Sequence, residues 1–211
     1  MSNDKFIDKF LKDFESIIKN ISQVDIDRVI KLLYESWKNG QQVFLAGNGG
    51  SAGTATHFAG DLAKFTSVEG KKRFRVLSLT ENVPLITAIT NDLGWENVYV
   101  EQLKNLMKNG DVLIVISVHG GSGADKAGQW SQNLMKAIKF AKENDGKVVG
   151  LAGFDGGLFK QVADLCIVVP IKSTPQVEGF HSVLAHLICA RLRELIVEFE
   201  GSVVLEDSIS G

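Results

Sequence analysis

The chain has few cysteines, no long apolar run and no excess of basic residues. Its 211 residues include two cysteines, three prolines and four histidines, and 23 basic residues nearly balance 25 acidic ones. Because the net charge is only −2, we expect no nucleic-acid partner and no polybasic membrane patch. No run of about 18 apolar residues occurs, so we expect no membrane span.

The two cysteines, Cys166 and Cys189, lie in apolar stretches and form no CxxC pair. They are therefore predicted to be reduced, buried thiols. Residues 1–14 carry charges throughout, which a secretory signal peptide does not. Both observations predict a cytoplasmic protein.

Two amphipathic helices are predicted before the first strand, within residues 1–40. Apolar residues recur every three or four positions from Phe6 to Ile21, and a second such helix runs from Asp25 to Asn39, with Gly40 as its stop. Their apolar stripes could cover a neighbouring subunit or pack on the sheet of their own chain. The sequence pattern leaves both alternatives open.

Strands and helices alternate in residues 41–200. Five short apolar runs read as strands: Gln42–Ala46, Phe74–Leu79, Val112–Ser117, Val148–Ala152 and Leu165–Val169. Six helices are predicted between and after them: Ser51–Phe65, Val83–Leu93, Asn97–Lys108, Ser131–Asn144, Leu158–Ala163 and Gln176–Glu200. This alternation predicts a single α/β domain with a doubly wound, parallel, five-stranded sheet. Ligands of such sheets bind at the carboxyl ends of the strands.

The first predicted strand ends in Gly47-Asn48-Gly49-Gly50-Ser51, and a helix follows at once. Glycines allow backbone N–H groups to approach an anion, and the helix N-terminus adds partial positive charge. The spacing Gly47-x-Gly49-x-x-Ala52 also fits a dinucleotide fingerprint, for which Glu81 would be the acidic residue. A tight turn that binds nothing is a further alternative.

The third predicted strand leads into a second Gly/Ser-rich loop. Its candidate anion ligands are Ser117, His119, Gly120, Gly121, Ser122 and Ser131. Two such loops on one sheet edge fit one phosphate held from several sides, whereas a dinucleotide would use mainly the first loop. We therefore predict a phosphorylated small molecule and no nucleotide, although the serines could also serve only as helix caps and turn residues.

Three of the four histidines lie on predicted helices. His57 and Asp61 are four residues apart, so they share a helix face and could bind Zn²⁺, act as acid and base, or form a solvent-facing pair. On the last helix, Glu178 and His186 are separated by about 12 Å, so they share a metal only if Glu178 precedes the helix body or two subunits contribute. His181 faces another way and is expected to be a packed histidine.

In order and spacing, these motifs resemble the sugar isomerase (SIS) domain family, and within it the phosphoheptose isomerases. The segments "TAITNDLGWENVY", "SQNLMKAI" and "LAGFDGG" are similar to that family as well. The resemblance implies aldose–ketose isomerisation of sedoheptulose 7-phosphate to D-glycero-manno-heptose 7-phosphate through an enediol. It also implies a homotetramer with active sites at subunit interfaces, in which the N-terminal helical pair takes part.

Site residues follow from the same resemblance. Asp61 and His186 would be the base and the acid, and one Zn²⁺ per site would be held by His57, Asp61, Glu178 and His186. The substrate-binding set would be Asn48, Gly49, Gly50, Ser51, Asp92, Ser117, His119, Gly120, Ser122, Ser131 and Glu178.

The chain departs from the family pattern at three places. Asp61 stands where the family usually has Glu, Glu178 stands where it usually has Gln, and the second loop carries an insertion. A related but non-catalytic protein that binds a phosphosugar or a partner protein, such as a replication initiator, remains the alternative function.

Overall fold

The computed structural model describes residues 2–121 and 131–199 and contains a five-stranded parallel sheet with strand order β2-β1-β3-β4-β5. The strands are β1 (Gln42–Gly47), β2 (Arg75–Ser78), β3 (Val112–Ile116), β4 (Lys147–Gly153) and β5 (Leu165–Val169). Leu45 of the interior strand β1 pairs with Ser78 on one side and Ile114 on the other. The predicted doubly wound α/β fold is confirmed.

Helices occupy most of the remaining described chain. They are α1 (Asn3–Asn20), α2 (Gln23–Asn39), α3 (Gly50–Gly60), α4 (Val83–Leu93), α5 (Val100–Leu106), α6 (Gln132–Glu143), α7 (Phe159–Val162) and α8 (Thr174–Glu198). Ser22 caps α2 by accepting a hydrogen bond from Asp25 N, and Gly40 ends that helix with a left-handed φ of 68°.

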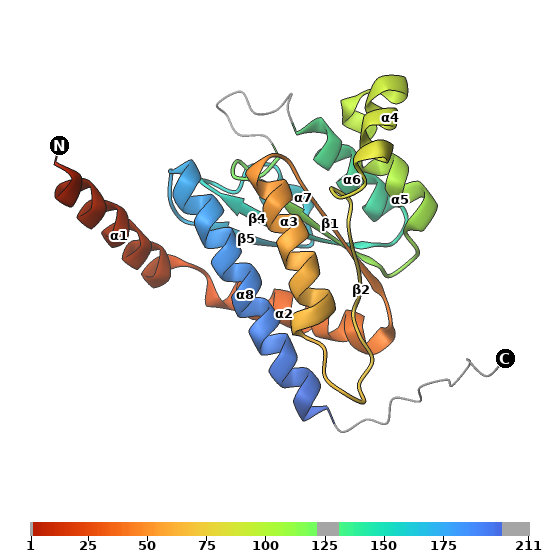
Figure 1. Ribbon diagram of the computed structural model, residues 1–211, viewed down its shortest axis with the longest axis horizontal. Helices are drawn as coiled ribbons and strands as arrows, with labels where there is room; N and C mark the ends of the chain where they lie inside the picture. Colours follow the sequence, from red (N-terminus) through yellow and green to blue (C-terminus); the bar gives the residue numbers. More distant parts are fainter. Residues whose placement is uncertain (1, 122–130, 200–211) are drawn as a thin grey trace.

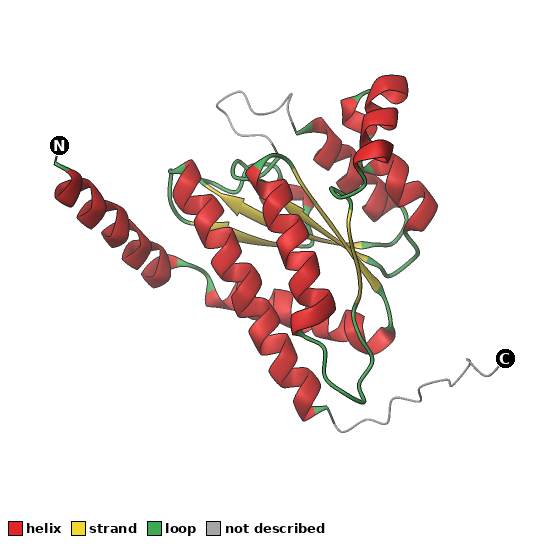
Figure 2. Cartoon of the chain, in the orientation of Figure 1, coloured by secondary structure: helices red, strands yellow, loops and turns green. Residues whose placement is uncertain are grey.

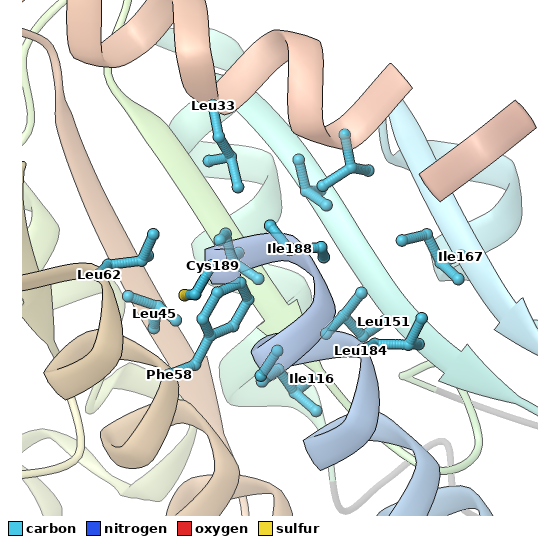
Figure 3. Packing of buried hydrophobic residues seen from close by; sticks show 14 of the residues in the cluster. Leu33, Leu45, Phe58, Leu62, Ile116, Leu151, Ile167, Leu184, Ile188 and Cys189 are labelled. Atoms are coloured by element: carbon cyan, nitrogen blue, oxygen red, sulfur yellow. The ribbon is translucent and has the colours of Figure 1, made fainter. Parts of the chain in front are cut away.

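The sheet is covered on both faces, as Figures 1 and 2 show. Helices α2, α3 and α8 pack on one face, and α4, α5, α6 and α7 pack on the other. Side chains alternate along a strand, so successive residues of β1 point to opposite faces of the sheet. Leu45 packs in the first core, under α2, α3 and α8, whereas Phe44 and Ala46 pack in the second core, under α4 to α7. Figure 3 shows the first core, to which α3 contributes Phe58 and α8 contributes Ile188 and Cys189.

Helix α1 extends away from this body (Figure 1). Ile17 is its one buried residue, whereas Phe6, Leu11 and Ile18 are each more than half exposed. Helix α2, by contrast, buries its apolar stripe on the sheet of its own chain. The two N-terminal helices therefore behave differently, and most of the apolar stripe of α1 has no cover within the described chain.

Three sequence-based expectations need correction. The helix predicted for residues 51–65 is α-helical only to Gly60 and continues as a π-helical turn, Asp61–Phe65. The helix predicted for residues 97–108 is shorter, because Asn97 belongs to a separate 3₁₀ turn, Trp95–Asn97, and α5 spans only Val100–Leu106. Both cysteines are free, but Cys166 is only partly buried because β5 is an edge strand.

Among the described residues, no helix combines the length and the apolar character needed to cross a membrane.

Replacing Leu45 by Ala should lower the free energy of unfolding by about 2–5 kcal/mol, because the fully buried side chain leaves a cavity between two layers. Urea denaturation measures the change. The control is Leu106→Ala on α5, where the side chain is 41% exposed and a change within about 0.5 kcal/mol is expected. Equal losses in the two variants would contradict the assignment of Leu45 to the core.

Candidate functional site

A polar pocket opens where the strand order reverses. After β1 the chain continues to β2 on one side of the sheet, and after β3 it continues to β4 on the other side. The loops that follow two such neighbouring strands diverge and leave a crevice at the carboxyl ends of the strands. The pocket has a volume of about 190 Å³. It is lined by Asn48, Ser51, Ile116, Ser117, Val118, His119, Leu134, Thr174 and Glu178. The structure thus brings both predicted loops to one place.

The β1–α3 turn can adopt its shape only with glycine at two positions. A Cβ on Gly47 would lie 2.4 Å from the backbone oxygen of Ser51, and Gly49 has a φ of +56°. Helix α3 begins at Gly50, immediately after this turn, so its N-terminal backbone dipoles are close to the pocket. Ser51 is 4% exposed and adds a hydroxyl group to the lining.

The second loop contributes Ser117 and His119. The Ser117 hydroxyl accepts a hydrogen bond from Gly121 N, and the His119 ring packs on Phe154 with centroids 4.4 Å apart. Only glycine fits at position 120, because a Cβ there would lie 2.0 Å from the Gly156 carbonyl oxygen. Ser131 is the N-cap residue of α6, makes no side-chain capping bond and does not line the pocket. Ser122 lies outside the described residues.

Glu178 approaches the start of α3 very closely. A Cβ on Gly50 would lie 2.6 Å from Glu178 Oε1, so in this arrangement the carboxylate occupies the space beside the Gly50 backbone. The side chain is partly buried and lines the pocket together with Ser51. A negative charge therefore stands at the helix end that also faces the predicted phosphate.

Three predicted ligands meet farther along the same pair of helices. Asp61 Oδ2 lies 3.3 Å from His57 Nε2 and 3.0 Å from His186 Nδ1. The two imidazole rings are 4.9 Å apart and nearly perpendicular. Figure 1 shows α3 and α8 side by side, and this packing joins His57 and Asp61 to His186, which is more than a hundred residues away in sequence.

Asp61 occupies an unusual backbone position and has an unusual oxygen. It begins the π-helical turn, and Thr66 N donates to Asp61 O across five residues. π-Turns within helices are frequent at functional sites. The Oδ2 atom is buried and has no hydrogen-bond partner among the described residues, although ring nitrogens of His57 and His186 lie 3.3 and 3.0 Å from it.

The residues at this point fit a bound metal ion. One ligand atom from each of His57, Asp61 and His186 lies within 4.8 Å of the others. Imidazole nitrogens and a carboxylate oxygen are ordinary Zn²⁺ ligands, and a cation would satisfy the buried Asp61 oxygen. Glu178 is not in this group, because it lies against Gly50, two turns away along α8. Its predicted role as a metal ligand would require two subunits to share a site.

His181 is the packed histidine that the sequence led us to expect. It is fully buried, and its Nε2 lies 3.2 Å from the carbonyl oxygen of Ala152 at the end of β4. Burial lowers the pKa of His181 to about 4, so the ring is neutral near pH 7.

The two residues predicted to contact sugar hydroxyls lie in different surroundings. The side-chain amide of Asn48 exchanges two hydrogen bonds with Asn133, of 3.0 and 2.9 Å. Asp92 is exposed on α4 and accepts a bond from Asn91; it is not part of the pocket lining. Sequence reasoning missed Asn133, although it belongs to the "SQNLMKAI" segment that carried part of the family resemblance.

Comparison with protein families and curated proteins gives consistent results. A family model described as "SIS domain" matches residues 5–153. The chain is 36% identical to a phosphoheptose isomerase of Aliarcobacter butzleri over 185 residues, which cover 87% of this chain and 93% of that protein. It is 41% identical over 163 residues to the lincomycin biosynthesis protein LmbN of Streptomyces lincolnensis, covering 75% of this chain but only 58% of that relative's length.

A solved structure supports the same relationship. The phosphoheptose isomerase GmhA from Neisseria gonorrhoeae superimposes with a TM-score of 0.78 at 27% identity. The match covers 90% of this chain and 96% of that one.

The buried His181 should make stability depend on pH. Its pKa in the folded protein is about 4, against 6.5 for an ordinary histidine, so the unfolded chain binds the proton more tightly. This contribution is fully present above pH 6.5 and is lost as the pH falls through 4, by up to about 3 kcal/mol.

The substitution His181→Gln should therefore flatten the fall in unfolding free energy between pH 6.5 and 4, as measured by urea denaturation at a series of pH values. Above this window the curves for the variant and the wild type should run parallel. An identical slope within the window would contradict a buried, neutral His181.

Proposed function

This chain belongs to the SIS domain family, and we propose that it is a phosphosugar aldose–ketose isomerase that interconverts sedoheptulose 7-phosphate and D-glycero-manno-heptose 7-phosphate. The choice of substrate follows the name shared by the Aliarcobacter butzleri relative and the Neisseria gonorrhoeae structure. The match to each spans most of both chains.

The observation that carries the proposal is the spacing of two clusters along the seam between α3 and α8. The phosphate-type pocket lies at the start of both helices, beside Gly50 and Glu178, and the His57–Asp61–His186 cluster lies farther along. Gly50 and His57 are seven residues apart, hence on the same face and about 10 Å apart along the helix. A phosphorylated sugar of several carbons can span that length, whereas a much shorter one would reach only one cluster.

At the pocket end, this chain's own groups would hold the phosphate. Ser51 and Ser117 present hydroxyls to the pocket, and the N-terminus of α3 contributes its dipole. Binding energy from this remote, unreactive group would fix the position of the carbonyl end. Gly49, Gly50 and Gly120 permit the close approach of backbone to ligand that such a site needs.

At the other end, Asp61 and His186 would move the proton between C1 and C2. Isomerisation through an enediol needs a base for a carbon-bound proton and an acid for the carbonyl oxygen. Asp61 is proposed as the base and His186 as the acid, 3.0 Å apart and therefore able to act on neighbouring atoms of one substrate. His57 would orient Asp61 from its other side.

We propose Zn²⁺ as the cofactor, held by His57, Asp61 and His186. When bound, it would polarise the substrate carbonyl. The chemistry of the donor set and the buried, unsatisfied Asp61 oxygen support this assignment.

A homotetramer is proposed as the assembly, with α1 as an interface element. The support is the exposed apolar stripe of α1 and a groove of about 490 Å³ lined largely by apolar residues of α1, α2 and α8. The proposed compartment is the cytoplasm, in keeping with the two free cysteines.

A related protein that binds a phosphosugar without turning it over is the second candidate. Such a protein would need the pocket but not the cluster of two imidazoles and a carboxylate. The presence of that cluster favours the enzyme.

The substitution His186→Ala should lower kcat/KM for sedoheptulose 7-phosphate by at least about 100-fold, because it removes the proposed acid. The measurement is NMR detection of the aldose product, with a panel of pentose, hexose and heptose phosphates offered to the wild type. Glu194→Gln, on an exposed part of the same helix, is the control and should keep full activity. Unchanged turnover by His186→Ala would refute the proposed mechanism.

A further inference from the structure

The β1–α3 turn is held in place by a buried network of polar side chains. Asn133, which is fully buried, donates from Nδ2 to Asn48 Oδ1 at 2.9 Å and accepts from Asn48 Nδ2 at 3.0 Å. Two reciprocal bonds between planar amides set both the position and the rotation of the Asn48 side chain.

Tyr99 joins the same network from α5's side of the sheet. Its hydroxyl donates to the Gly47 carbonyl and lies 3.2 Å from Asn48 Oδ1. Burial raises the pKa of Tyr99, so the hydroxyl remains a donor at physiological pH. The carbonyl before the turn and the side chain within it are thus held by residues from two different helical segments.

Asn133 is the second residue of α6, and its side chain also bonds to the backbone of that helix. Its Oδ1 accepts from Leu134 N at 2.8 Å, near the start of α6, where the N-cap residue Ser131 makes no side-chain capping bond. One buried amide therefore ties the end of β1 to the beginning of α6. Both segments border the pocket, through Asn48 after β1 and Leu134 in α6.

We propose that Asn133 is a positioning residue for phosphate binding, and that it acts through the side chain of Asn48. It holds the β1–α3 turn against the start of α6, so that Ser51 and the N-terminus of α3 keep their place in a pocket that Leu134 of α6 also lines. The proposal rests on the proposed function only in taking the pocket for the phosphate end of the substrate. Because the Asn48 amide bonds to Asn133 through both its oxygen and its nitrogen, this pair also sets the orientation in which Asn48 lines the pocket.

The test is a double-mutant cycle with Asn48→Ala, Asn133→Ala and the double variant, using inorganic phosphate as the probe in calorimetry. Each single variant should bind phosphate about tenfold more weakly, since breaking the pair leaves a partly buried amide unsatisfied. The double variant should bind phosphate about as tightly as the single variant with the lower affinity, because both changes remove the same interaction. Additive losses would overturn the proposal.

Two controls separate positioning from general damage. Asn144→Ala removes the same residue type at the other end of α6 and should leave phosphate binding unchanged. Metal content should stay at the wild-type level in every variant, because the His57–Asp61–His186 cluster lies two turns away from the network; loss of metal along with phosphate would indicate a structural role only. Should Asn133→Ala fail to fold, Asn133→Asp, which keeps the size of the side chain but loses the Nδ2 donor to Asn48 Oδ1, replaces it in the cycle and should show the same lack of additivity with Asn48→Ala.

The outcomes also separate this inference from the proposed function. Phosphate binding without turnover of sedoheptulose 7-phosphate would refute the isomerase and leave the cycle interpretable. A wild-type protein that binds neither inorganic phosphate nor the sugar phosphate would overturn both.

Discussion

The packing of α3 against α8 is the interaction on which the proposed site depends. The two helices start at the same end of the sheet and remain side by side, sharing a core that includes Phe58 and Ile188. That apolar contact places the Glu178 carboxylate at the start of α3, and it also places His186 beside Asp61. The apolar packing of α3 on α8, which stabilises the fold, thus also determines the distance between the pocket at Glu178 and the His57–Asp61–His186 cluster.

Much of this arrangement could be read from the sequence, because the relevant signals are local. Continuous apolar runs identified the five strands, and glycines after the first and third runs identified the two loops. The spacing of His57 and Asp61 placed them on one helix face. Parallel strands then required that the two loops share a sheet edge, as the lining of the pocket bears out.

Other features depend on contacts between distant segments and were missed for that reason. Nothing local distinguishes Asn133 from a surface residue of α6, since its partner Asn48 lies 85 residues earlier. The π-turn at Asp61 was likewise missed, because its sequence has ordinary helical propensity and only the Thr66–Asp61 hydrogen bond reveals it.

The central claim is that α3 and α8 bring two imidazoles and one carboxylate to a common point that holds Zn²⁺. X-ray absorption at the zinc edge, on purified protein loaded with one equivalent of the metal, tests it most directly. The account predicts zinc bound by nitrogen and oxygen ligands, with scattering from two imidazole rings in the wild type and from one in His186→Ala. Zinc that does not bind, or that shows sulfur ligands or no imidazole, would contradict it.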